Sequence, residues 1–347
     1  MDPAPDRTDG GTVIHRTETH RASTATEVAE TAEAVCRAVS TVIAGKDEQV
    51  RTAVTVLLAG GHLLLEDVPG VGKTMLAKAL AGAIDATVRR VQFTPDLLPS
   101  DITGISVFNQ ENRSFEFRPG AVFTNLVIGD EINRASPKTQ SALLEAMEEG
   151  QVTTDGVSRP LPRPFMVLAT QNPLEMEGTY PLPEAQRDRF MARLSMGYPT
   201  ADAETAMLAA HGEHRPLRDL SPVIDATTVE QLVESVRHLH AGEAVQRYVV
   251  ELVRATRTSS GLRLGASPRA GLHLLRAARA RAAMSGRDHV LPDDVQQLAV
   301  PVLAHRVLPA GGAGGLGGAH GAAVDVIETL LAQVPVVGVT GRRPGSR

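Results

Sequence analysis

The chain has 347 residues, 42% of them hydrophobic, which is enough to bury a sizeable core and argues against an intrinsically disordered protein. Its formal net charge of −5 argues against a surface that binds nucleic acid all over, although a local basic groove is compatible with it. The single cysteine, Cys36, excludes a disulfide within the chain, and the absence of an apolar run long enough to span a membrane favours a cytoplasmic location.

The N-terminal half reads as strands alternating with helices. Residues 1–24 contain acids, proline and glycine without an apolar segment, which predicts a disordered tail. Helical spacing of apolar residues predicts helices over 25–44 and 48–59. The sequence then predicts a short strand from His62, a glycine loop, a helix over 73–84 and a second strand over 87–93.

Two hairpins and two buried strands follow. Alternating residues over 104–122 and 151–162 predict the hairpins, the second turning at Asp155-Gly156. Continuous apolar runs predict buried strands over 124–131 and 165–172, with a helix over 137–149 between them. The alternation predicts an α/β core over residues 25–198, a parallel sheet covered by helices on both faces.

Beyond Tyr198 the sequence predicts only helices. They cover residues 229–238, 243–258, 268–284 and 292–304, and a last one lies within 324–334. The glycine-rich segment 310–322 interrupts them as a flexible linker, and residues 338–347 form a polar tail. Residues 199–337 are therefore expected to form a separate all-helical domain.

The segment "EDVPGVGKT", residues 66–74, differs from the phosphate-binding pattern G-x-x-x-x-G-K-[ST] at its first glycine, which is Asp67 here. Gly70 and Gly72 remain, and they allow the backbone amides to approach phosphates closely. Lys73 can reach the outer phosphates, and the Thr74 hydroxyl can ligate Mg²⁺. If Asp67 has an ordinary φ angle, glycine is not required there. The predicted nucleotide-binding residues of this loop are Val68, Pro69, Gly70, Val71, Gly72, Lys73, Thr74 and Met75.

The predicted buried strand over residues 124–131 ends in two acidic residues, Asp130 and Glu131. An acid pair after a buried strand can hold Mg²⁺ through Asp130 and polarise an attacking water through Glu131. Taken alone, this pair would read as a surface turn, but together with the glycine loop it indicates nucleotide hydrolysis. Asn172 follows the next apolar strand, where a neutral amide could orient the same water.

Four stretches, in order, resemble the MoxR family of AAA+ ATPases. They are "QFTPDLLPSDITG", "DEINRASPKTQSALLEAMEEGQVT", "ATQNPLEMEGTYPLPEAQRDRF" and "GASPRA". The resemblance extends from about residue 28 to residue 337, and it includes the loop with Asp67. It implies a P-loop AAA+ core followed by a helical lid, with ATP and Mg²⁺ as ligands.

The resemblance also assigns residues. Asn172 resembles sensor 1, and Arg269 resembles sensor 2, which reaches the γ-phosphate from the lid. Arg189 resembles the arginine finger that meets a neighbouring subunit's ATP, with Arg187 as its rival. Ile43 and Gly45 resemble part of the adenine pocket. Arginine suits the finger and sensor 2 because its charged fork of donors neutralises charge on phosphoryl oxygens.

The family implies a homo-oligomeric ring, expected to be a hexamer, and a chaperone-like role on a protein client that can carry a von Willebrand factor A domain. The two hairpins resemble pore-facing insertions of this branch, although they can equally be exposed hairpins without a role. Two alternatives remain: a motor stimulated by nucleic acid, and a nucleotide-gated scaffold without turnover. Low net charge and few aromatics count against the motor, and intact Glu131, Asn172 and Arg189 count against the scaffold.

Overall fold

The computed structural model describes residues 23–336, except Pro69, 173–177, 202–203, 206–215 and 312–315. Its centre is a parallel sheet of five strands in the order β2-β5-β8-β1-β9. The strands are β1 (Leu63–Glu66), β2 (Val88–Gln92), β5 (Leu126–Asp130), β8 (Met166–Gln171) and β9 (Ala192–Leu194). The short edge strand β9 was not predicted, because three residues carry too little alternation to be recognised.

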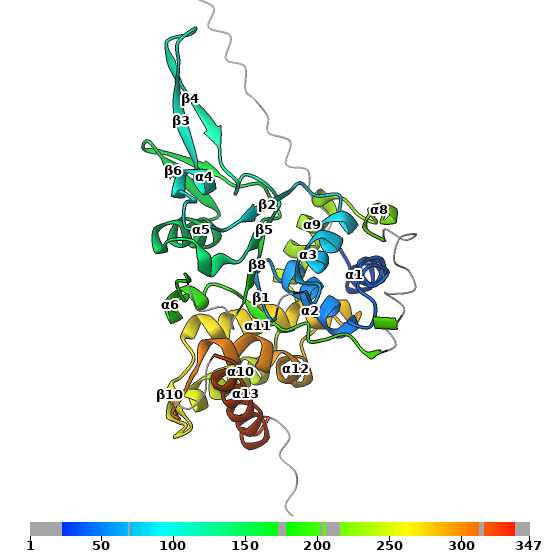
Figure 1. Ribbon diagram of the computed structural model, residues 1–347. Helices are drawn as coiled ribbons and strands as arrows, with labels where there is room; N and C mark the ends of the chain where they lie inside the picture. The colour runs from blue at the N-terminus through cyan, green and yellow to red at the C-terminus, as the bar shows by residue number, and fades with distance from the viewer. Residues whose placement is uncertain are drawn as a thin grey trace, which may run out of the picture.

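The sheet has a separate hydrophobic core on each face, because successive side chains of a strand point to opposite sides. Leu63 and Leu65 belong to one core and Leu64 to the other. The first core contains α1 (Ala25–Ser40), α2 (Asp47–Leu58) and α3 (Lys73–Ala83). The second contains α5 (Pro137–Glu149), on the opposite side of the sheet in Figure 1. This arrangement confirms the predicted α/β class.

Both predicted hairpins are present. Strands β3 (Gly104–Asn109) and β4 (Ser114–Pro119) pair antiparallel, as do β6 (Gln151–Thr154) and β7 (Val157–Pro160). The β3–β4 hairpin projects from the body formed by the other labelled elements, with β6 near its base (Figure 1). Two short helices before it and after β5 were not predicted: α4 (Pro99–Thr103) and η1 (Ile132–Arg134).

The second domain contains α8 (Pro216–Asp219), α9 (Ala226–Arg237), α10 (Glu243–Thr258), α11 (Pro268–Met284), α12 (Pro292–Leu303), η2 (Ala304–Arg306) and α13 (Leu316–Gln333). Helices α10 and α11 have the predicted bounds. At α11 the start is encoded locally, because Ser267 caps the first turn and Pro268 occupies its first position. The prediction of helices alone was wrong, since β10 (Leu262–Leu264) pairs antiparallel with β11 (Leu308–Pro309).

The glycine-rich segment was also partly misjudged. Helix α13 begins at Leu316, so residues 316–322 are helical rather than a linker. Glycine disfavours a helix intrinsically, but tertiary burial overrides that preference. Ala323 and Ile327 of α13 are fully or almost fully buried. Residues 312–315 lie outside the described part of the chain.

The ends of the described region refine two further predictions. Residues 1–22 and 337–347, which include most of the predicted tails, lie outside the described residues. Thr24, placed in the N-terminal tail by sequence, instead caps α1: its hydroxyl accepts a hydrogen bond from the Glu27 amide, and the Glu27 carboxylate accepts one from the Thr24 amide. Helix α1 ends at Ser40, earlier than predicted. Within the described residues, no helix has both the length and the apolar character that crossing a bilayer requires.

His62, directly before β1, connects strand β8 to helix α5 through its two ring nitrogens. The Val167 amide donates to its Nδ1 at 3.0 Å, and its Nε2 lies 3.0 Å from the Met147 carbonyl. The ring is therefore neutral with the proton on Nε2. Burial lowers the pKa of His62 from 6.5 to about 4, only partly offset by the hydrogen bond to Met147.

We expect this histidine to make stability fall at acidic pH. Between pH 6.5 and about 4 the unfolded chain takes up a proton that the folded chain excludes, so the free energy of unfolding drops by about 3 kcal/mol. Chemical denaturation across this range measures the slope. His62→Gln should flatten it relative to the wild-type chain, while exposed His238→Gln should not. Equal slopes in the wild type and His62→Gln would contradict this assignment.

Candidate nucleotide-binding site

The glycine loop connects the end of β1 to the start of α3, as predicted. Gly70 and Gly72 have φ angles of +83° and +93°, which side-chain-bearing residues rarely adopt. A Cβ atom on either glycine would have free space, so the conformation and not crowding requires glycine. Gly72 is the residue before α3, whose first amides and dipole point toward the loop. Pro69 lies outside the described residues.

Asp67 does not need to be glycine. Its backbone has no positive φ angle, and its amide donates to the Gln171 carbonyl at 3.3 Å. The loop thus leaves the sheet in an ordinary conformation, attached to the end of the neighbouring strand β8. An ordinary φ angle at this position removes the need for a glycine, and Asp67 has one.

The Lys73 ammonium lies over the loop entrance. It donates to the carbonyls of Asp67, Val68 (3.2 Å) and Gln171 (3.4 Å). Burial lowers its pKa, although four nearby carboxylates oppose that shift. An ammonium held by neutral carbonyls at the start of α3 is positioned to bind an anionic ligand.

Thr74 and Asp130 meet at the carboxyl end of the sheet. The Thr74 hydroxyl donates to Asp130 Oδ1 at 3.1 Å, and Thr170 donates to the same oxygen at 3.3 Å. Arg90 Nε, from β2, lies 2.6 Å from Asp130 Oδ2. A hydroxyl and a carboxylate oxygen side by side are a donor set that Mg²⁺ accepts, so these residues fit the predicted metal.

Glu131 has a left-handed backbone conformation, with φ 58°, which costs about 1–2 kcal/mol for a residue with a side chain. Its amide donates to the Thr170 hydroxyl at 3.0 Å. Its Oε2 atom accepts hydrogen bonds from Gln92 Nε2 and lies near Arg134 Nε, both at 3.0 Å. The acid is thus aimed along the edge of the sheet beside Asp130 and not into the core.

The remaining predicted nucleotide-site residues lie in the same region or around it. Asn172 is buried directly after β8, whose last residue pairs with Glu66 of β1, so it lies at the carboxyl edge that carries the glycine loop. Val71 is buried, while Val68 and Met75 are half-buried. Ile43 is buried in the core on the α1–α3 side, and Gly45 is exposed with φ +71°.

Arg189 and Arg269 lie together, on one carboxylate. Arg189 Nε is 2.8 Å from Glu148 Oε2, and Arg269 bonds to Glu148 Oε1. Arg187, the rival finger, lies instead near Glu184, at 3.8 Å. Arg189 of the α/β core and Arg269 of the second domain therefore lie side by side on the Glu148 carboxylate.

This arginine pair lies near the amino ends of the parallel strands, whereas the glycine loop lies at their carboxyl ends. Arg189 comes three residues before β9, which starts beside Leu63, the first residue of β1. Glu148 follows Met147, whose carbonyl contacts His62 just before β1. The loop leaves β1 at its far end, and four strand residues span about 13 Å. The two arginines therefore lie near the amino end of the strands, and their own chain's Lys73 lies at the carboxyl end.

Asp188, between the two finger candidates, anchors this segment to the second domain. Its carboxylate accepts hydrogen bonds from Ser267 and from Arg306 Nε, the latter at 2.8 Å. Arg306 is buried and also donates to the carbonyls of Phe190 and Met191. The segment that carries Arg189 is therefore attached to the second domain through Asp188.

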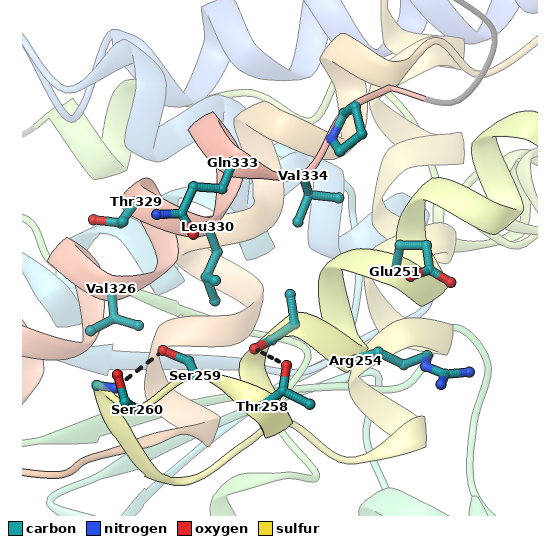
Figure 2. Close-up of a pocket in the computed structure, with 13 residues that line it drawn as sticks. Glu251, Arg254, Thr258, Ser259, Ser260, Val326, Thr329, Leu330, Gln333 and Val334 are labelled. Carbon is teal, nitrogen blue, oxygen red and sulfur yellow. Dashed lines mark hydrogen bonds between the residues drawn. The ribbon is translucent and has the colours of Figure 1, made fainter.

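A wide groove of about 840 Å³ lies elsewhere, between α10 and α13. Figure 2 shows Glu251, Arg254 and Thr258 on one side and Thr329, Leu330 and Gln333 on the other. The groove is in the second domain, away from the glycine loop. It takes no part in the nucleotide site.

Several side chains of this site were not recognised from sequence. Gln92 and Arg90 contact the two acids from β2, and they are two residues apart in "TVRRVQF". Polar residues with this spacing share one side of a strand, which is a usable signal for a site at its edge. Glu148 and Asp188 gave no such signal, because only the fold brings them to the arginines.

Comparisons with known proteins agree with this geometry. Residues 62–192 match the family described as ATPase family associated with various cellular activities, and residues 254–317 match its lid domain. The chain is 51% identical to the uncharacterized protein YeaC of Bacillus subtilis, over 78% of this chain and 84% of that protein. It is 42% identical to the chaperone MoxR1 of Mycobacterium tuberculosis, over 78% and 74%, respectively. A solved structure from Cytophaga hutchinsonii, given as a candidate ATPase, superposes with a TM-score of 0.81 at 37% identity, covering 90% of this chain and 97% of that one.

Proposed function

The chain belongs to the MoxR family of AAA+ ATPases, and on that premise we propose that it hydrolyses ATP with Mg²⁺ to remodel a protein client. The observation that carries the proposal is the convergence of Lys73, Thr74, Asp130 and Glu131 on one edge of the sheet. A P-loop, metal-binding oxygens and a base are the parts that phosphoryl transfer to water requires.

Each residue has one task in the proposed reaction. The amides of the glycine loop and the Lys73 ammonium bind the phosphate chain of ATP. Thr74 and Asp130 would hold Mg²⁺, which neutralises charge on the phosphate oxygens. Glu131 accepts a proton from the attacking water, and Asn172 orients that water. Ile43 and Gly45 contribute to the pocket for adenine.

The reaction is proposed to occur between subunits of a homo-oligomeric ring, with six as the expected number. Arg189 and Arg269 lie at the edge of the sheet opposite their own Lys73, which supports a role at a neighbouring subunit's ATP. A head-to-tail contact of this kind closes into a ring when the rotation between subunits permits. The guanidinium groups would leave Glu148 for phosphate oxygens as the γ-phosphate is transferred.

The client-binding surface is proposed to include the β3–β4 hairpin. Of the seven phenylalanines in the chain, Phe108, Phe115 and Phe117 lie on this hairpin. Phe108 and Phe115 are 49% and 73% exposed, with ring centroids 5.3 Å apart. Exposed aromatic pairs on a projecting element are typical of contact surfaces for apolar segments of a partner. The naming of a relative as a chaperone supports the same role.

The expected activity of the purified chain is release of phosphate from ATP that depends on Mg²⁺. A chelator should reduce the rate to background because Thr74 and Asp130 then lack the ion, and added Mg²⁺ should restore it. Single-stranded DNA should leave the rate unchanged, which separates this function from a nucleic-acid motor. Failure of the assembled chain to bind ATP in the presence of Mg²⁺ would overturn the proposal.

A further inference from the structure

The side chain of Asp67 links the glycine loop to the segment that leaves the sheet after β9. Its Oδ2 atom accepts hydrogen bonds from the Ser195 hydroxyl at 2.7 Å and from the Gly197 amide at 2.6 Å. Its Oδ1 atom accepts one from the Val68 amide at 2.8 Å. Three donors thus converge on the residue that occupies the place of the usual first glycine.

The segment held by Asp67 continues to the proposed adenine side of the site. The Tyr198 carbonyl accepts a hydrogen bond from Lys46 Nζ at 2.9 Å. A Cβ atom built on Gly197 would lie 3.9 Å from the same nitrogen. Residues 195–198, which we call the exit segment, therefore bridge the loop entrance and Gly45–Lys46.

We propose that Asp67 is a positioning residue that sets the affinity for the base of the nucleotide by fixing the exit segment against the glycine loop. The inference rests on the proposed function, because it assumes that adenine lies near Ile43 and Gly45. It predicts a division of labour: the loop's own glycines and Lys73 hold the phosphates, and the Asp67 carboxylate holds the wall on the base side.

The chemistry of the three contacts requires a carboxylate. One oxygen receives two donors and the other receives one, so both must be acceptors. The NH₂ group of an asparagine would face one or two of these donors and could not accept from them. A glycine would have no side-chain acceptor at all. The hydrogen bonds from Ser195, Gly197 and Val68 hold the pKa of Asp67 below its usual value even though burial alone would raise it, so the carboxylate is ionised at neutral pH.

The test compares ATP with inorganic tripolyphosphate, which has the phosphate chain without the base. We expect Asp67→Gly, which restores the usual motif, to weaken ATP binding about tenfold or more, since hydrogen bonds to a charged group are lost. Tripolyphosphate should bind to this variant within about twofold of the wild type because Gly70, Gly72 and Lys73 are unchanged. Isothermal titration calorimetry with Mg²⁺ present measures both dissociation constants.

Three further variants sharpen the result. Ser195→Ala removes one of the three donors and should weaken ATP binding less than Asp67→Gly. Asp67→Asn keeps the shape of the side chain and should still weaken ATP selectively, which keeps the test valid if the glycine variant folds poorly. Asp96→Gly, at an exposed turn before α4, is the matched control and should bind both ligands as the wild type does.

Two outcomes would overturn the inference. Unchanged ATP affinity in both Asp67 variants would mean that the exit segment does not contribute to base binding. Equal weakening of ATP and tripolyphosphate would mean that Asp67 supports the whole loop. A wild-type chain that binds neither ligand would instead contradict the proposed function itself, so the two failures are distinguishable.

Discussion

Replacing Glu131 by Gln is expected to lower steady-state ATP turnover by at least about 100-fold while ATP binding persists, because a general base contributes about 10²–10⁴ in rate. The amide keeps the size of the side chain and can still meet Gln92, but it cannot accept a proton from water. The residues proposed to bind the phosphates and Mg²⁺, Lys73 and Thr74, are unchanged in this variant. Glu131 is therefore expected to act on the chemical step and not on affinity.

Phosphate release at saturating ATP, together with ATP titration, measures these two effects separately. Glu149→Gln is the matched control, since it makes the same change at an exposed acid at the end of α5 and should leave turnover unchanged. If Glu131→Gln turned over ATP at the rate of the wild type, another group would have to be the base. If it lost ATP binding as well, its role would be structural.

The same variant provides a test of the client. A ring that binds ATP without hydrolysing it should retain a bound protein that the wild type releases during turnover. Capture by the Glu131→Gln chain with ATP, compared with ADP, measures this retention. Adding Phe115→Ser should reduce capture without reducing ATP binding, because the side chain is exposed on the β3–β4 hairpin, which projects away from α3, the helix that begins at Lys73 (Figure 1). Undiminished capture would place the client surface elsewhere.

The parts of the site that sequence predicted are those carried by contiguous residues. The glycine loop and the Asp130–Glu131 pair each combine a local backbone pattern with the chemistry, and a buried strand before each fixes the edge where they meet. The same holds for helix α11, whose start is set by Ser267 and Pro268. Local signals of this kind survive in any fold that forms the element.

The parts that sequence did not predict depend on residues distant along the chain. Glu148 joins Arg189 to Arg269, which is 121 residues away from it, and no local pattern marks that carboxylate. The sequence shows that Asp67 replaces the first glycine of the motif, but only the fold shows that it contacts Ser195 and Gly197. The helical state of residues 316–322 likewise depends on tertiary burial of α13 and opposes the propensity of glycine.

The position of Arg189 beside Glu148 leads to a second prediction, which concerns the rate of ATP hydrolysis. Arg189→Ala alone is expected to slow hydrolysis by about 10³-fold or more, which is the scale of arginine fingers in related phosphoryl transfer. If Arg189 serves the neighbouring subunit, an inactive Arg189→Ala chain and an inactive Glu131→Gln chain should restore activity when assembled together. In such a ring the intact Glu131 of one chain meets the intact Arg189 of the other.

In a random equal mixture, about a quarter of the interfaces combine both intact residues, so turnover should recover to about that share of the wild-type rate. Mixing Glu131→Gln with the double variant Glu131→Gln/Arg189→Ala is the control, because no interface then contains a base. No recovery in the first mixture would mean that Arg189 acts within its own chain, contrary to its position beside Glu148. Recovery with Arg187→Ala, but full activity of Arg189→Ala alone, would transfer the role to Arg187. Since the arginine pair lies about a strand's length from its own Lys73, recovery in the first mixture is the outcome that we expect.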